Sequence, residues 1–154
     1  MNSFIYDNLA CQRGKGTTKA IERMKYHLRK YFLENHTNKG YYVKLDIHHY
    51  FQSTPHQKLK EIVAERIVQP DFQKRVFEII DSFKDERPQE EISHDEFGER
   101  GIGLGSQCSQ LLQLLYLDEL DHLIKEKFHV AHYLRYMDDM IILVSSKEEA
   151  TSLL

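Results

Sequence analysis

Apolar residues recur at three- and four-residue intervals along residues 17–34, which predicts an amphipathic helix. Its expected buried stripe consists of Ile21, Met24, Leu28, Tyr31 and Phe32. After a turn, residues 41–47 alternate between apolar and polar side chains, the pattern of a half-buried strand. This alternation predicts that Asp46 lies on the polar face of that strand.

Two further helices are predicted in the middle of the chain. Thr54 is the expected N-cap and Pro55 the expected first residue of one helix, which Pro70 ends. Asp71 is the expected cap of the next helix. The inward positions of the two helices are expected to be Leu59, Ile62, Val63, Ile67, Phe72, Val76, Ile79, Ile80 and Phe83. The acidic segment 84–100 is predicted to be an exposed loop or hairpin.

The last third of the chain is richer in apolar residues. A long helix is predicted from about residue 106 to residue 128, and its leucines point in so many directions that burial on several sides is expected. Residues 131–137 and 140–144 predict the two strands of a hairpin, the second of them a central strand. Asp138 and Asp139 are expected at its turn.

Ser146 and Glu149 have the spacing of a capping box that opens a final helix. The chain stops within this helix, which indicates a fragment of a longer protein. The mixture of long helices and antiparallel strands predicts an α+β fold.

Composition narrows the class of protein. The chain has 154 residues, of which 41% are apolar and 29% charged, so one packed domain is expected and wholesale disorder is excluded. No apolar run is long enough to span a membrane, and no signal-peptide core begins the chain. Cys11 and Cys108 lie far apart, which favours two free thiols in a reducing cytoplasm.

The net charge of −3 conceals two halves of opposite sign. Residues 1–60 hold 11 Lys/Arg against 4 Asp/Glu, a balance of +7, and residues 61–154 hold 10 against 20, a balance of −10. Such a split is typical of a protein that holds a polyanion near bound metal ions. Ordinary surface patchiness is the alternative explanation.

Asp138 and Asp139 are the sharpest chemical signal. Adjacent carboxylates between two apolar strands repel each other and favour a cation between them. An acidic type I′ turn with no further role is the alternative. Asp46 adds a third acid at strand level, and oxygen ligands from two strands suit two Mg²⁺ ions when phosphates supply the other ligands.

Four motifs, in order, resemble reverse transcriptases. Residues 136–139 (YMDD) and 44–51 (KLDIHHYF) resemble the family's two acidic motifs. Residues 13–17 (RGKGT) are similar to the fingers loop of bacterial reverse transcriptases, and residues 101–110 (GIGLGSQCSQ) to their Gly-rich motif. The resemblance covers nearly the whole chain and implies a polymerase palm, a small antiparallel sheet packed on long helices.

The resemblance implies a partial fingers region over residues 1–40, a palm over residues 41–154, and no thumb in this chain. It also implies a role for each matched residue. Asp46, Asp138 and Asp139 would be catalytic and, with the carbonyl of Ile47, would bind two Mg²⁺ ions, for which Mn²⁺ could substitute. Nucleotide contacts would come from Arg13, Lys15, Tyr50, Phe51, Gly105 and Gln110, and template or primer contacts from Leu104, Tyr136 and Met137.

Two of these roles leave an alternative open. The ring of Phe51 would exclude a ribose 2′-hydroxyl by clash, but one of the two rings of Tyr50 and Phe51 is expected to be core. The cations Arg13 and Lys15 would meet a triphosphate, or they form an ordinary solvated loop.

The Gly-rich motif lacks the usual Pro-Gln-Gly and instead resembles that of diversity-generating retroelements, which copy a template RNA with errors at adenines. Leu104 stands where relatives carry an amide side chain. Loss of that amide contact would relax the checking of base pairs. A group II intron, retron or phage-defence reverse transcriptase is the alternative, and an inactive nucleic-acid-binding module a remote one.

The resemblance implies an RNA template, a DNA or RNA primer and dNTPs as partners, with an accessory protein of the retroelement as a further candidate. It implies a cytoplasmic enzyme, bacterial or phage-encoded, with no membrane partner. The family's primer grip and thumb follow the acidic hairpin, so we expect these 154 residues alone to be weakly active or inactive.

Overall fold

A computed structural model describes residues 4–153, which divide into two compact units. The sheet unit consists of the described residues up to Ile47 together with residues 117–153, and the helical unit of residues 48–116. The sheet unit contains α1 (Thr17–Asn35), β1 (Tyr41–Leu45), α7 (Asp118–His122), η1 (Leu123–Lys127), β2 (Tyr133–Tyr136), β3 (Asp139–Val144) and α8 (Lys147–Ser152). The helical unit contains α2 (Tyr50–Ser53), α3 (His56–Arg66), α4 (Pro70–Ser82), α5 (Gln89–His94) and α6 (Gln107–Tyr116).

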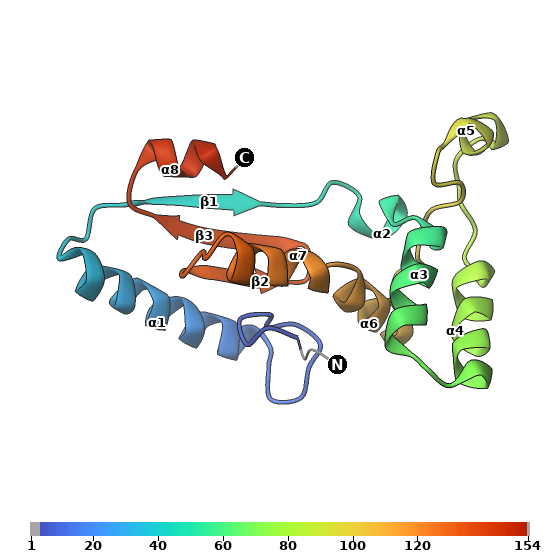
Figure 1. The fold of residues 1–154 in the computed structure, drawn as a ribbon, viewed down its shortest axis with the longest axis horizontal. Helices are drawn as coiled ribbons and strands as arrows, with labels where there is room; N and C mark the ends of the chain where they lie inside the picture. Colours follow the sequence, from blue (N-terminus) through green and yellow to red (C-terminus); the bar gives the residue numbers. More distant parts are fainter. Residues whose placement is uncertain (1–3, 154) are drawn as a thin grey trace. The chain divides into compact units, whose positions relative to one another are not determined.

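The sheet has three antiparallel strands in the order β1-β3-β2 (Figure 1). The apolar strand β3 is central, as predicted, and Ile142 pairs with Val43 on one side and Tyr133 on the other. α1 contacts β2, and α8 contacts β1 and β3. The buried core of the unit consists of Ile5, Val43, Ile124, Tyr133, Met140, Ile142 and Val144. Helices and a small antiparallel sheet together agree with the predicted α+β class.

The predicted helix over residues 17–34 is confirmed, but its predicted buried stripe holds only in part, since Tyr31 is buried and Met24 half-buried. The buried residues of α1 are His27 and Tyr31, whereas Ile21, Leu28 and Phe32 are each about half exposed. The face of α1 that carries His27 and Tyr31 is buried because both side chains make polar contacts within the sheet unit. His27 Nδ1 lies 3.2 Å from His132 Nδ1, and the Tyr31 hydroxyl lies 3.4 Å from the carbonyl of Val144.

The hairpin is confirmed, but its turn is one residue earlier than predicted. Tyr136 pairs with Asp139, so Met137 and Asp138 are the two turn residues and Asp139 begins β3. Met137 has a φ of 56°, in the left-handed region that side chains other than glycine rarely adopt.

The capping box that opens α8 is confirmed at Ser146, whose hydroxyl accepts a hydrogen bond from the Glu149 N–H at 3.0 Å. The return bond of the box differs from the expected one. The Glu149 carboxylate accepts from the backbone N–H of Ser145 at 2.9 Å instead of from the cap residue.

The single helix predicted over residues 106–128 is wrong. The chain forms α6, leaves helical dihedrals at Leu117 (φ −96°, ψ 3°), and continues as α7 and the π-helical turn η1. The break accompanies two acids, Asp118 and Asp121, that are fully buried in α7. The expected burial on several sides is confirmed, since Leu112, Gln113 and Leu114 are consecutive and all buried, although Leu111 is half exposed.

The helical unit packs α3 against α4 and α6 around Leu59, Val63, Val76, Ile80, Ile102 and Leu112. Pro55, and not Thr54, is the N-cap of α3, because the buried Thr54 hydroxyl donates to the carbonyl of Tyr50 at 2.9 Å. Pro70 opens α4 instead of ending α3, since a proline lacks only an N–H that the first helical position does not use.

The ends and faces of α4 also depart from the sequence pattern. Asp71 lies in the first turn of α4 without capping it, so the predicted cap is wrong. Val76 and Ile80 are buried as predicted, but Phe72 and Ile79 are exposed. Among the described residues α4 packs mainly against α3, so it buries a narrower stripe than its apolar residues would allow.

Segment 84–100 is more ordered than the predicted loop or hairpin, since it contains α5 and a network of ion pairs. The Arg87 guanidinium donates to Asp85 and Asp95 at 2.6 Å each, and Arg100 donates to Asp95 at 2.6 Å. The hydrogen bonds from Arg87 lower the pKa of Asp85 to about 2 against the opposing effect of burial.

Replacing Asp85 with asparagine is expected to reduce the free energy of unfolding at pH 7 by about 1 to 2 kcal/mol. The folded pKa of Asp85 lies below its ordinary value of 3.8, so its stabilising effect is complete above about pH 4 and is lost as the pH falls toward 2. Denaturant unfolding at pH 7 and at pH 2 measures this difference, which should shrink toward zero at the lower pH. The exposed Glu96, changed to glutamine, is the matched control and should show no difference at either pH.

Candidate active site

Three acids gather at one end of the sheet. Leu45 pairs with Met140, so one further step in the same antiparallel register brings Asp46 opposite Asp139, and Asp138 is the adjacent turn residue. Asp46 and Asp139 are exposed and Asp138 is half-buried. The structure therefore brings together, in one unit, the three carboxylates that the sequence placed in two distant segments.

Lys44 lies among these acids, and sequence reasoning did not single it out. Its Nζ is 2.8 Å from Asp139 Oδ1. The hydrogen bond and charge of Asp139 raise the pKa of Lys44, and the charges of Asp46 and Asp138 raise it further. The available signal was the two-residue spacing of Lys44 and Asp46, which puts both side chains on one face of a strand. One of the three carboxylates, Asp139, thus already pairs with a cation, and the other two act on it through their charge.

The donor set suits a hard divalent cation. Carboxylate oxygens favour Mg²⁺ or Mn²⁺ over softer metals, and the Lys44 ammonium shows that these oxygens can hold positive charge. Within residues 4–153, no group of three or more His, Cys, Asp or Glu side chains is close enough to form a metal cage. Mg²⁺ does not need one, because it keeps several waters and takes ligands from substrate phosphates beside one or two carboxylates.

The predicted fingers loop lies beside the acidic hairpin within the sheet unit. The Tyr136 hydroxyl is 3.3 Å from Thr17 Oγ1, and Met137 Sδ is 3.6 Å from Cys11 Sγ. Tyr136 is partly exposed, at 38% of its surface. Residues predicted to contact template or primer are thus next to the turn that carries Asp138.

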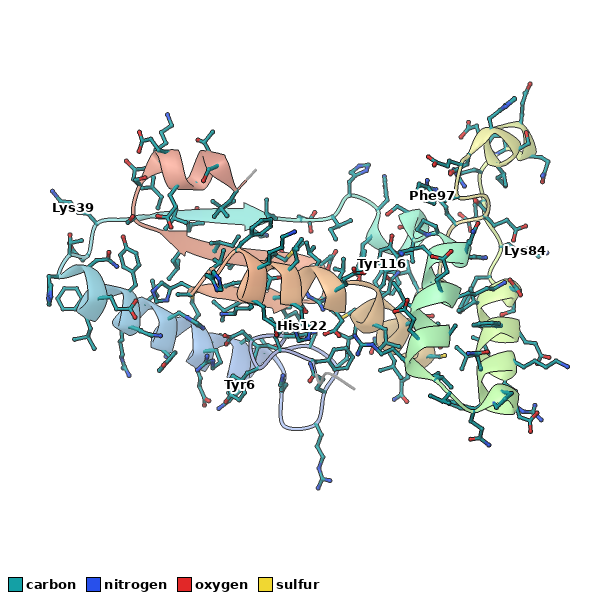
Figure 2. All side chains as sticks on the ribbon, in the orientation of Figure 1. Tyr6, Lys39, Lys84, Phe97, Tyr116 and His122 are labelled. Atoms are coloured by element: carbon teal, nitrogen blue, oxygen red, sulfur yellow. The ribbon has the colours of Figure 1, made fainter. Side chains whose placement is uncertain are left out.

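The two cations of the loop differ in their surroundings. Arg13 is exposed, whereas Lys15 turns inward and donates to the carbonyls of Asn8 at 2.6 Å and Tyr6 at 3.0 Å. Burial lowers the pKa of Lys15. Figure 2 shows Tyr6 beside the first turns of α1, where Arg23 Cζ lies 4.6 Å from its ring centroid. Lys15 therefore holds its own loop together, and contact with a triphosphate stays a prediction.

The remaining predicted nucleotide residues belong to the helical unit. Tyr50 is only 3% exposed and its hydroxyl donates to the carbonyl of Gln113 at 2.6 Å, so Tyr50 is the core residue of the pair. Phe51 is half-buried against the apolar core of this unit. In the Gly-rich motif Leu104 is 70% exposed and Gly105 has a φ of 87° with no atom near a Cβ position, while Gln110 is half-buried on α6.

A buried ion pair beneath the acidic turn was also missed. Arg135 and Asp121 are both fully buried, and the Arg135 guanidinium reaches the carbonyl of Met137 at 2.8 Å. The available signal was the charge of Arg135 in a strand whose other residues are mostly apolar.

An antiparallel sheet with three carboxylates at one end, one of them paired with a lysine, is a candidate site for nucleotidyl transfer. The model of the family described as reverse transcriptase (RNA-dependent DNA polymerase) matches residues 1–154. The chain belongs to this family and is a nucleotidyltransferase, an RNA-directed DNA polymerase. The family uses divalent metal ions and acts on a nucleic acid template, a primer and dNTPs.

A comparison with curated proteins finds no match. None of the helices within residues 4–153 is both long enough and apolar enough to cross a membrane.

Proposed function

We propose that this chain forms the palm, residues 41–154, and part of the fingers, residues 1–40, of a reverse transcriptase that works by two-metal catalysis. The observation that carries the proposal is the position of Asp46, Asp138 and Asp139 at one end of the sheet, where Asp139 pairs with the Lys44 ammonium. The family match supplies the reaction, RNA-templated addition of a dNTP to a primer 3′-hydroxyl.

In this proposal Asp46 and Asp138 are the principal metal ligands, and Asp139 and the carbonyl of Ile47 complete the protein's share. Two bound Mg²⁺ ions would favour ionisation of the primer hydroxyl and neutralise charge on the phosphates. The chain itself contributes mainly position and charge stabilisation. Strand β3 holds Asp139, Asp46 directly follows β1, and the two-residue turn carries Asp138.

The other proposed roles follow the resemblance. Arg13 and Lys15 would meet the incoming triphosphate, while Gly105 and Gln110 would contact the nucleotide. Leu104, Tyr136 and Met137 would line the path of template and primer. Exposure of Arg13 and Leu104 supports these roles, and the buried Tyr50 would support the site from within the core. We propose a cytoplasmic enzyme, since neither Cys11 nor Cys108 forms a disulfide.

Primer extension tests the proposal directly. The protein expressed from its complete coding region, given an RNA template, a primer and dNTPs, should extend the primer with Mg²⁺ or Mn²⁺ and stop on chelation of the metal. Intact protein that binds template and primer but extends nothing with either metal would favour the inactive nucleic-acid-binding module.

We further propose that the enzyme belongs to a diversity-generating retroelement, whose accessory protein would be a partner. Leu104 supports this subclass, because an exposed apolar side chain cannot supply the amide contact made by relatives. We expect misincorporation opposite template adenine to exceed that opposite the other bases by about tenfold or more. Sequencing of copied products measures this ratio, and Leu104→Gln is the matched variant that should lower it. Equal error at all four bases would leave a group II intron, retron or phage-defence enzyme.

A further inference from the structure

A fully buried ion pair lies directly under the turn that carries Asp138. Arg135, in β2, and Asp121, in α7, each have side chains with 0% exposed surface. Removal of both charges from water is costly, and a well-packed apolar pair in the same place often gives equal or greater stability. A contribution to the stability of the fold therefore does not by itself explain why this buried ion pair is present.

The geometry of the guanidinium accounts for the pair in another way. Nε and Nη2 of Arg135 donate to the two Asp121 oxygens at 2.8 and 2.7 Å, a two-pronged interaction that fixes the plane of the guanidinium. Nη1 then donates to the carbonyl of Met137 at 2.8 Å. Asp121 thus orients Arg135, and Arg135 holds the backbone of the turn.

The orientation of the Met137 carbonyl directly affects Asp138. It shares a planar peptide group with the N–H of Asp138, so its direction sets where the Asp138 backbone and carboxylate begin. Met137 itself is in the left-handed region, which is unfavourable for a residue with a side chain and persists only where the surroundings impose it. The hydrogen bond from Arg135 is such a constraint.

Further contacts fix both members of the pair. The Tyr133 hydroxyl and the Asn8 amide donate to the Asp121 carboxylate at 2.7 and 3.3 Å. The backbone of Arg135 donates to the carbonyl of Asp7 at 3.0 Å and accepts from the N–H of Leu9 at 2.9 Å. The N-terminal segment, α7 and β2 therefore converge on one rigid support.

We infer that Arg135, oriented by Asp121, is a positioning residue that fixes the turn and thereby aims the Asp138 carboxylate. This inference rests on the proposed function, in which Asp138 is a metal ligand. Groups that orient metal ligands in this way commonly contribute 10- to 100-fold in metal affinity or activity, so the loss of Arg135 should show in both.

The test is the double variant Arg135→Met, Asp121→Leu, made in the protein expressed from its complete coding region. Replacing both charges by apolar side chains avoids an unpaired buried charge but leaves the Tyr133 hydroxyl, the Asn8 amide and the Met137 carbonyl without these partners. The protein should therefore fold with a moderately lower midpoint of thermal unfolding. Mn²⁺ binding to the protein in the presence of dNTP, measured by electron paramagnetic resonance and corrected for Mn²⁺ bound by dNTP alone, should weaken about tenfold or more. The kcat for primer extension should fall by a similar factor, with little change in the KM for dNTP.

Two further variants keep the test decisive. Arg135→Lys retains the buried charge but not the fork, so it should fold and still bind Mn²⁺ more weakly than the wild type. Val144→Ala, a core change at the other end of β3, matches the loss of stability without touching the turn and should bind Mn²⁺ normally.

The outcomes distinguish a failure of the positioning role of Arg135 from a failure of the proposed function. Wild-type Mn²⁺ affinity and kcat in both the double variant and Arg135→Lys would overturn the positioning role, as would losses no larger than those of Val144→Ala. Absence of Mn²⁺ binding by the wild type, or equal binding and activity in Asp138→Asn, would instead contradict the proposed function.

Discussion

Replacement of Asp138 with asparagine is expected to reduce RNA-templated primer extension by about 10³-fold or more while leaving the fold intact. The amide has nearly the same shape as the carboxylate but carries no charge, so it is a poor ligand for a hard divalent cation. It also removes a fixed negative charge from a site whose catalysis is electrostatic, where the loss of one group costs about 10² to 10³ in rate. The side chain is half-buried at a turn, so the substitution creates neither a cavity nor a clash.

Single-turnover extension with saturating Mg²⁺ measures this effect, and circular dichroism establishes that the variant is folded. Glu148→Gln is the matched control, because Glu148 is an exposed acid of the same unit in the first turn of α8. It should retain activity within about twofold, as expected for a surface substitution away from the site. Full activity in Asp138→Asn would show that this carboxylate does not hold the metal.

The sheet and its hairpin could be predicted from the sequence because their signals are local. A run of apolar residues in β3 requires neighbours on both sides, and the alternation in β1 identifies one buried face. The turn was misplaced by one residue because Asp139, although charged, pairs with Tyr136 and continues the strand. The sequence does not distinguish a charged turn residue from a charged residue that begins a strand and forms an ion pair. Asp139 is of the second kind, since it pairs with Lys44.

The orientation of α1 and the break after α6 could not be predicted, because both depend on distant partners. Periodicity identified the helix, but the buried face was chosen by contacts of His27 and Tyr31 with residues more than a hundred positions away. In the same way, the partner of the buried Asp121 is an arginine in a strand, and nothing in the leucine-rich pattern announces it. Tertiary pairing of polar groups here overrides the local apolar pattern.

The acids of the candidate site were identified from the sequence pattern, and the resemblance then gave them roles. The strand register places them at one end of the sheet. The groups that support them, Lys44 and Arg135, were missed because each is an ordinary charged residue until its partner is known. For Arg135 the signal is a charge in an otherwise apolar strand. For Lys44 it is the two-residue spacing from Asp46, which puts both side chains on one face of a strand.

Replacement of Phe51 with alanine is expected to increase the use of ribonucleotides relative to deoxynucleotides by about 10²-fold. A ring can reject a single hydroxyl group only if it cannot move aside, and the structure holds this ring firmly. Its backbone carbonyl accepts from the N–H of Ile102 at 2.7 Å, which ties α2 to the Gly-rich motif within the helical unit. Its side chain packs on the core of that unit, beside the buried Tyr50.

The ratio of kcat/KM for a dNTP to that for the matching rNTP, on one RNA template, measures the selectivity. Phe51→Tyr keeps the bulk of the ring and should keep the selectivity, which separates size from chemistry. Phe77→Ala removes another ring packed on the same core, so it controls for lost stability and should leave the ratio unchanged. If Phe51→Ala discriminates as well as the wild type, Phe51 is a core residue only, because a clash that disappears with the ring must leave a mark on this ratio.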